Sequence, residues 1–183
     1  AKLDLSEAEI VLITDVSGSM DKCFDESLRP CGGEEYKLEA AQRIQSIFIT
    51  DIYSELGTDL LKLGAIEFDH SARDHGIFNK DQQGALINVI DDYSASGGTC
   101  ITDALRLVDP QQIVILLSDG VSGCLDPVYY VEEGGYRGGP IYTIGIGGAD
   151  VNTLRDISDI TGGEYSYATD PIDLENVYLD LVS

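Results

Sequence analysis

Two apolar runs, each followed by an aspartate, constrain the fold of this chain more than any other feature. Residues 10–13 and 113–117 are apolar at every position, which is typical of strands buried on both faces of a parallel sheet. The first run leads to Asp15 and the second leads to Asp119. These segments therefore predict central strands of an α/β sheet, with a carboxylate at the end of each strand.

The rest of the chain alternates between strand and helix patterns. An apolar stripe with helical spacing predicts a helix from residue 34 to Leu56, with Gly57 as its stop. Further strands are expected over residues 60–68, 72–78, 141–146 and 164–168, and further helices over residues 81–93, up to 107, 127–133, 151–160 and 172–182. This alternation predicts a doubly wound α/β fold, with a mostly parallel central sheet, helices on both faces and one antiparallel edge strand.

The chain of 183 residues is long enough for one domain, and its 43% hydrophobic content suffices for a substantial core. No linker or repeat divides it, so we expect a single domain over residues 1–183. Because no leader-like segment precedes the first strand, we expect this domain to be excised from a larger protein. The longest apolar run, residues 113–117, is far too short to span a bilayer, so no direct membrane insertion is expected.

The chain is strongly acidic, with 33 Asp and Glu residues against 11 Lys and Arg residues and a formal net charge of −22. A surface of this sign repels phosphate backbones and anionic lipids, so we expect no nucleic-acid partner. The acidity fits either adaptation to high salt, where abundant cations screen self-repulsion, or attraction of divalent cations.

The four cysteines, Cys23, Cys31, Cys100 and Cys124, allow three pairings. None of them forms a C-x-x-C pair, which argues against a structural zinc site. We favour two disulfides over free buried thiols. A bridge between Cys23 and Cys31 would close a small loop ahead of the first helix.

A loop of polar side chains follows the first predicted strand and has the sequence Asp15-Val-Ser17-Gly-Ser19. Alone, an Asp-x-Ser pattern is more often a helix N-cap than a metal site. The glycine-rich loop that ends in Thr99 offers another hydroxyl, and Asp119 offers a second carboxylate. Ligands of open α/β sheets bind beyond the carboxyl ends of the strands, where these groups should meet. Their oxygens are hard ligands that suit Mg²⁺, Mn²⁺ or Ca²⁺.

These residues resemble the metal ion-dependent adhesion site of the von Willebrand factor type A domains and their relatives, the integrin inserted domains. The family motif, D-x-S-x-S followed by a Thr and then an Asp, matches at all five positions and in order. The resemblance covers nearly the whole chain, including the segment at residues 144–147 and the terminal helix. The chain departs from the family in the short spacing between Thr99 and Asp119, and in the cysteine-bracketed loop after Met20.

The resemblance implies that Ser17, Ser19 and Thr99 contact one divalent cation directly, most readily Mg²⁺, while Asp15 and Asp119 act partly through water. Neutral hydroxyls leave the cation under-neutralised, so an open position on it attracts an outside carboxylate. The implied partner is a protein that presents an Asp or Glu residue. The isolated domain is expected to be a monomer.

The rim around this metal site should meet the partner, and its expected residues are Met20, His70, Gly98 and Gly120. Cys100 and Cys124 both belong to loops on the metal rim, so a bridge between them would tie two ligand loops together. The bridge between Cys23 and Cys31 would stiffen the third. Asp69-His70 and Asp74-His75 are interpreted as a solvated hairpin tip rather than as a second metal site.

Three functions are compatible with these residues. The leading hypothesis is a non-catalytic adhesion module, extracellular or at a cell surface if the disulfides form. The alternative is an intracellular assembly subunit of an ATPase-type machine, which would be cytoplasmic and carry free thiols. A metal-dependent hydrolase or phosphotransferase is less favoured, because the Asp15 loop lacks the second Asp of an aspartyl-phosphate motif and no P-loop is present. We therefore expect no enzyme activity.

Overall fold

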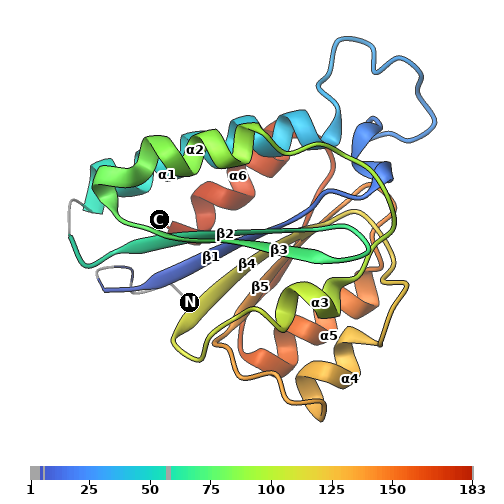
Figure 1. Ribbon diagram of the computed structural model, residues 1–183. Coiled ribbons are helices and arrows are strands. Elements are labelled where there is room, and N and C mark those ends of the chain that lie inside the picture. Colours follow the sequence, from blue (N-terminus) through green and yellow to red (C-terminus); the bar gives the residue numbers. More distant parts are fainter. Residues whose placement is uncertain (1–4, 6, 57–58, 183) are drawn as a thin grey trace.

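A six-stranded sheet forms the centre of the computed structural model, which describes residues 5, 7–56 and 59–182 (Figure 1). The strands run in the order β3-β2-β1-β4-β5-β6. All neighbours pair in parallel except β3, which is antiparallel to β2. Their bounds are β1 Glu9–Asp15, β2 Lys62–Phe68, β3 Ala72–Phe78, β4 Gln112–Ser118, β5 Ile141–Ile146 and β6 Tyr165–Ala168. The predicted mostly parallel sheet with one antiparallel edge strand is confirmed.

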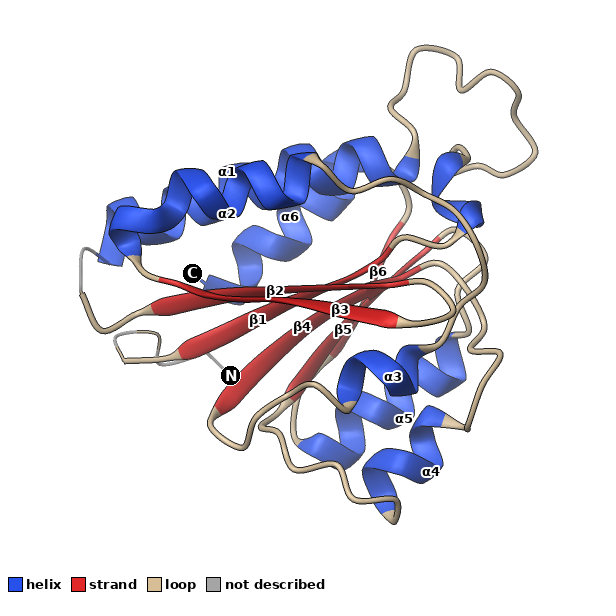
Figure 2. Cartoon of the chain, viewed as in Figure 1, coloured by secondary structure: helices blue, strands red, loops and turns tan. Residues whose placement is uncertain are grey.

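Helices cover both faces of the sheet, as predicted. Figure 2 shows α1, α2 and α6 on one face and α3, α4 and α5 on the other. Their bounds are α1 Lys37–Leu56, α2 Gln83–Asp91, α3 Ile101–Leu105, α4 Pro127–Glu132, α5 Val151–Thr161 and α6 Pro171–Val182, with short 3-10 turns at η1 Gly18–Asp21 and η2 Lys80–Gln82. None of these helices, in the part of the chain that is described, is both long and apolar enough to cross a membrane.

The first helix starts later than its apolar spacing predicted. It begins at Lys37 rather than at residue 34, because the preceding residues complete a turn in which the Glu34 amide donates to the Cys31 carbonyl. Gly57, the expected stop, lies outside the described residues. The short helix predicted up to residue 107 is present as α3, but it ends at Leu105, two residues earlier than predicted.

The two hydrophobic cores explain why β1 is apolar at consecutive positions. Ile10 and Leu12 belong to the cluster under α1, α2 and α6, whereas Val11 and Ile13 belong to the cluster on the opposite face. Side chains alternate between the two faces of a strand, so a strand covered on both sides needs apolar residues throughout. The run at residues 113–117 occupies the adjacent strand β4 for the same reason.

The fold places a crevice at the carboxyl ends of β1 and β4. These strands are neighbours, with Thr14 opposite Leu117 in the parallel register. The connection from β1 leads through α1 to β2 on one side, while β4 and β5 extend the sheet on the other side. Such a reversal of strand order is where open α/β sheets bind ligands. Asp15 and Asp119 are therefore carried to the same edge of the sheet.

Candidate functional site

Hydroxyls and carboxylates from β1, η1 and the end of β4 meet in this crevice. The Oγ atoms of Ser17 and Ser19 lie 3.1 Å apart, and Ser19 Oγ donates a hydrogen bond to Asp119 Oδ1 at 2.8 Å. The backbone amide of Ser17 donates to Asp15 Oδ1 at 2.8 Å. Hydrogen bonds thus bring together four of the five residues predicted as metal ligands.

Thr99, the fifth predicted ligand, borders the same space. A Cβ atom built on Gly120 would lie 3.4 Å from Thr99 Oγ1 and 3.9 Å from Asp15 Oδ2, so both oxygens face this glycine. The loop that carries Thr99 approaches η1 closely, because the Gly18 amide donates to the Gly97 carbonyl at 3.0 Å. Gly97 has φ of +79°, a conformation that glycine adopts without strain. Its conformational freedom therefore lets the loop reach the site.

Two disulfides hold the loops around the site. Cys23 is bonded to Cys31 and Cys100 to Cys124, with Cα–Cα distances of 5.3 Å and 5.4 Å. The second bridge connects the residue after Thr99 to the loop that follows β4, and the Gly123 amide also donates to the Thr99 carbonyl at 2.8 Å. Both predicted bridges are present, and none of the four cysteines is free among the described residues.

Asp15 is fully buried beneath the hydroxyls. Ser118 Oγ donates to its Oδ2 atom at 2.8 Å, and its Oδ1 atom accepts the amide of Ser17. Burial, together with the negative charge of Asp119, raises the pKa of Asp15 to about 6. The hydrogen bonds from Ser17 and Ser118 act in the opposite direction. The site thus holds two adjacent carboxylates in a setting that favours a compensating positive charge.

Sequence reasoning missed a buried lysine that supplies part of this positive charge. Lys37 Nζ lies 2.8 Å from Asp119 Oδ2, 2.5 Å from Glu26 Oε1 and 3.4 Å from the carbonyl oxygen of Ser19. Its side chain is completely buried, as is that of Asp119. The signal was available, because Lys37 falls on the apolar stripe of α1, four residues before Ala41. A charged residue on a buried stripe indicates a buried partner.

Ser118 was also missed as part of the site. Its hydroxyl orients Asp15 across the pair of central strands, at 2.8 Å. No local pattern distinguishes it from any other serine at a strand end. Its role follows only from the pairing of β1 with β4.

The donor set fits a hard divalent cation. The cluster offers hydroxyl and carboxylate oxygens only, which are the ligands that Mg²⁺, Mn²⁺ and Ca²⁺ prefer. Among the described residues, neither this crevice nor any other place brings together three His, Cys, Asp or Glu side chains that could hold a metal ion by themselves. A site at this crevice therefore depends on Ser17, Ser19 and Thr99. Lys37 leaves one oxygen of Asp119 facing Ser19 and occupies the other.

The four predicted rim residues differ in their placement. The prediction was wrong for Met20, which is fully buried in the core cluster under α1 because its side chain is apolar and η1 turns it inward. His70 is exposed and lies against the Thr99 loop, since Cβ atoms built on Gly97 and Gly98 would lie 3.2 Å and 3.7 Å from its side-chain atoms. Gly98 is exposed and Gly120 is partly exposed.

The fold and the site define a class of protein. It is a doubly wound α/β domain with a cluster of hydroxyls and carboxylates at the carboxyl ends of its central strands β1 and β4. The family model described as "von Willebrand factor type A domain" matches residues 9–179. The chain therefore belongs to the von Willebrand factor type A family and is a protein-interaction domain.

Individual relatives agree with this assignment. The chain is 26% identical over 187 residues to calcium-activated chloride channel regulator 1 from Macaca mulatta, a match that covers 93% of this chain and 18% of that protein. The chain thus spans less than a fifth of the length of this relative.

Solved structures share the fold. A von Willebrand factor type A structure from Catenulispora acidiphila has a TM-score of 0.76 at 21% identity, covering 96% of this chain and 42% of that one. The PilB minor pilin from Streptococcus sanguinis has a TM-score of 0.76 at 17% identity, covering 100% of this chain and 62% of that one.

Proposed function

We propose that this domain is a metal-dependent adhesion module that binds an acidic residue of a protein partner through one divalent cation. The observation that carries the proposal is the convergence of Ser17, Ser19, Asp15 and Asp119 on one crevice, bordered by Thr99. These five residues would hold the cation, with Mg²⁺ as the first candidate and Mn²⁺ or Ca²⁺ as alternatives. When bound, the cation supplies a Lewis-acidic position for an outside carboxylate.

The charges around the crevice support binding of an outside anion. Asp15 and Asp119 contribute two negative charges, and Lys37 already compensates part of them through Asp119. A dication added to this set exceeds the negative charge that remains between the two carboxylates. The surplus positive charge favours one further carboxylate. Within the described chain, the carboxylates of the crevice, Asp15 and Asp119, already accept hydrogen bonds, so the further carboxylate would come from a partner.

The disulfides favour an extracellular or cell-surface setting for this function. Disulfides persist in oxidising compartments, and both bridges close loops at the rim of the candidate metal site. The intracellular assembly subunit considered from the sequence would carry free thiols, so it is the less favoured function. The match to calcium-activated chloride channel regulator 1 adds a relative whose name includes calcium activation of a channel.

Isothermal titration calorimetry with Mg²⁺ tests the metal site. The unaltered protein should bind one Mg²⁺, and Thr99→Val, which removes a hydroxyl while keeping the side-chain shape, should weaken binding by about tenfold or more. Thr50→Val is the matched control, because the hydroxyl of this exposed threonine donates to the Ser46 carbonyl within α1 and takes part in none of the crevice contacts described above. Equal Mg²⁺ affinity in the two variants would overturn the proposed site.

Selection of a random peptide display library on the immobilised domain tests the partner chemistry. Phage bound in Mg²⁺ and eluted with EDTA should carry peptides that contain Asp or Glu and that lose binding when this residue becomes Asn or Gln. Peptides without acidic residues, or binding that persists in EDTA, would contradict carboxylate recognition through a metal.

A further inference from the structure

Lys37, the buried lysine at the start of α1, departs from two rules that lysines ordinarily follow. Its side chain is completely buried, although lysine is almost never fully buried without a partner. It is also the first residue of an α-helix, where the helix dipole disfavours a positive charge. Departures of this kind from local preference concentrate at functional sites. The position of this lysine therefore indicates a role beyond packing.

Contacts on several sides hold the ammonium group of Lys37 in place. An ammonium has three donors, and the Nζ atom uses them on Asp119 Oδ2, Glu26 Oε1 and the carbonyl oxygen of Ser19. The turn between β5 and α5 closes a further side, because a Cβ atom built on Gly147 would lie 2.6 Å from Nζ. The positive charge is therefore held beside Asp119.

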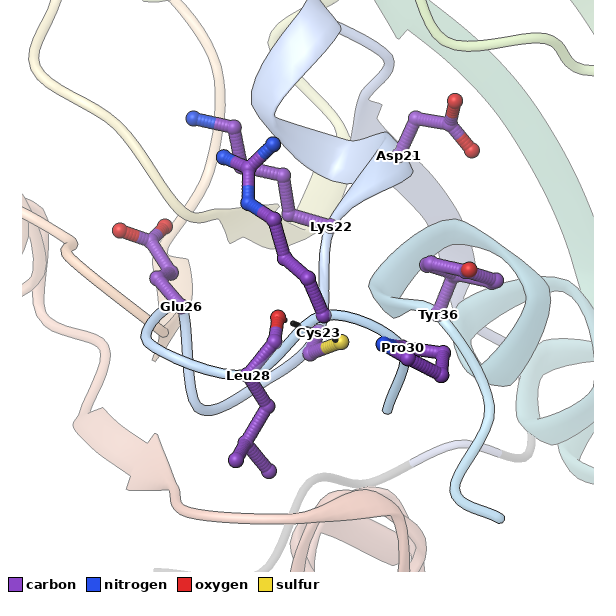
Figure 3. A pocket seen from close by; sticks show the side chains of 8 residues that line it. Asp21, Lys22, Cys23, Glu26, Leu28, Pro30 and Tyr36 are labelled. Carbon is purple, nitrogen blue, oxygen red and sulfur yellow. Dashed lines mark hydrogen bonds between the residues drawn. The ribbon is translucent and has the colours of Figure 1, made fainter. Parts of the chain in front are cut away.

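The two carboxylates that share this lysine differ in their environment. Asp119 has a fully buried side chain, whereas 39% of the Glu26 side chain is exposed. Glu26 belongs to the loop that the Cys23 disulfide closes, and Figure 3 shows it among the residues that line a pocket of 290 Å³. Water screens this exposed carboxylate, while charges in the buried pair interact more strongly because the local dielectric constant is lower. Lys37 therefore neutralises mainly Asp119.

The buried ion pair changes the charge of the candidate metal site. Asp15 and Asp119 alone carry two negative charges, which would balance a divalent cation. The positive charge of Lys37 lowers this sum to one negative charge, so a divalent cation leaves one positive charge in surplus. Each oxygen of Asp119 also already accepts a hydrogen bond, one from Ser19 and one from Lys37. The site therefore keeps an attraction for an outside carboxylate when the cation is present.

We propose that Lys37 is a positioning residue that holds Asp119 and sets the charge balance of the metal site. It lowers the affinity of the site for the cation and raises the affinity of the cation-loaded site for a carboxylate of the partner. The inference rests on the proposed function, in which this site holds a divalent cation. A site of this kind favours binding of the partner over tight retention of the metal.

Calorimetry with Mg²⁺ alone tests the first half of this inference, at about pH 8, well above the pKa of Asp15. Lys37→Met should bind Mg²⁺ about ten- to hundredfold more tightly than the unaltered protein, because repulsion between nearby positive charges is lost. Arg43→Met is the matched control, since it removes one positive charge from a surface ion pair on the same helix. It should change the affinity by about twofold or less, because solvent screens this charge. Equal or weaker binding by Lys37→Met would overturn the inference.

A second variant, Glu26→Gln, decides the question if Lys37→Met does not fold. Glu26 is partly exposed, and glutamine keeps a hydrogen-bond acceptor for Lys37 while it leaves the lysine charge to Asp119 alone. Mg²⁺ should therefore bind this variant about threefold or more weakly than the unaltered protein. Glu35→Gln is the control, because it removes the same charge from the surface pair with Arg43. A loss in Glu26→Gln no larger than in this control would overturn the role of Lys37.

Acetate is the probe for the second half of the inference. Protein loaded with Mn²⁺ is titrated with acetate while the relaxation rate of water protons is measured, which falls as acetate displaces water near the cation. Acetate should bind loaded Lys37→Met about three- to tenfold more weakly than loaded unaltered protein or loaded Arg43→Met. A lysine that served only the fold would not move the affinities for metal and for acetate in opposite directions.

The outcomes separate failure of this role from failure of the metal site. If the unaltered protein binds neither Mg²⁺ nor Mn²⁺, the proposed function itself fails. If it binds them and Lys37→Met gains no affinity for Mg²⁺, the role of Lys37 is overturned while the proposed metal site stands. If acetate binds loaded Lys37→Met as tightly as the loaded unaltered protein, the link between Lys37 and partner binding is overturned.

Discussion

The lysine at the start of α1 should contribute more stability than a residue at a helix end ordinarily does. The Lys37 side chain is completely buried, and its Nζ contacts Asp119, Glu26 and the carbonyl oxygen of Ser19. Lys37→Met keeps a long, unbranched side chain while it removes the charge and these three contacts. The variant therefore isolates the electrostatic role of the lysine.

The magnitude follows from what the substitution leaves unpaired. Asp119 is completely buried, and without Lys37 the hydrogen bond from Ser19 is what remains of its contacts in the crevice. Removing one partner of a buried ion pair costs about 3–5 kcal/mol in the free energy of unfolding. Glu26 has 39% of its side chain exposed and regains water, so it adds little. For a domain of this length, the loss corresponds to a fall in Tm of about 6–20 °C.

Urea denaturation of the metal-free proteins, followed by circular dichroism, measures this loss. Arg43→Met is the matched control, because Arg43 lies on the same helix in an exposed ion pair with Glu35. Such surface pairs contribute about 0–1 kcal/mol. Saturating Mg²⁺ should recover part of the loss in Lys37→Met, since a ligand that binds only the folded state stabilises that state.

A loss in Lys37→Met no greater than that in Arg43→Met would refute the reasoning. It would mean that Asp119 is not held as a buried anion that needs a cation. If Lys37→Met loses about 3–5 kcal/mol in the free energy of unfolding and Mg²⁺ does not reduce this loss, the ion pair still contributes to stability. This result would, however, contradict the proposal that a dication takes over the neutralisation of Asp119.

Three further predictions concern the same edge of the sheet. Burial, with the charge of Asp119, raises the pKa of Asp15 from 3.8 to about 6, so between these pH values the folded state binds a proton that the unfolded state releases. The metal-free protein should therefore lose stability as pH rises from about 4 to about 6. Urea denaturation at several pH values should show that Asp15→Asn weakens this dependence. Replacing Cys100 and Cys124 by serine opens a loop with a sequence separation of 24 and should cost about 3–4 kcal/mol in the same assay. Gly97→Ala should cost about 1–2 kcal/mol because of its φ of +79° and weaken Mg²⁺ binding by calorimetry, whereas Gly84→Ala, in a helix with open space around it, should leave Mg²⁺ binding unchanged.

The sheet was predictable because its signals are local. The apolar runs at residues 10–13 and 113–117 became the neighbouring central strands β1 and β4. Burial on both faces demands consecutive apolar residues, and this pattern is visible without knowledge of the partner strands. Element ends were less certain, as with α1, where the disulfide-closed loop delays the helix until Lys37.

The members of the candidate site were predictable for a different reason. The spacing of Asp15, Ser17 and Ser19 forms a compact motif, and Thr99 and Asp119 complete it in order. Their convergence follows once both aspartates are assigned to the carboxyl ends of adjacent parallel strands. The side chains of Ser19 and Asp119, 100 residues apart in the chain, indeed meet at 2.8 Å.

The sequence by itself thus determined the sheet, the ligand motif and the four cysteines, because hydrophobic periodicity and short motifs are properties of neighbouring residues. Only the tertiary structure decided that Met20 is buried. It also decided that Lys37 contacts both Asp119, which lies 82 positions away in the chain, and Glu26, which lies 11 positions away. It also decided that Lys22 lines a pocket beside the candidate metal site. Contacts of this kind depend on where loops and helix ends meet after folding, so residue spacing alone does not specify them.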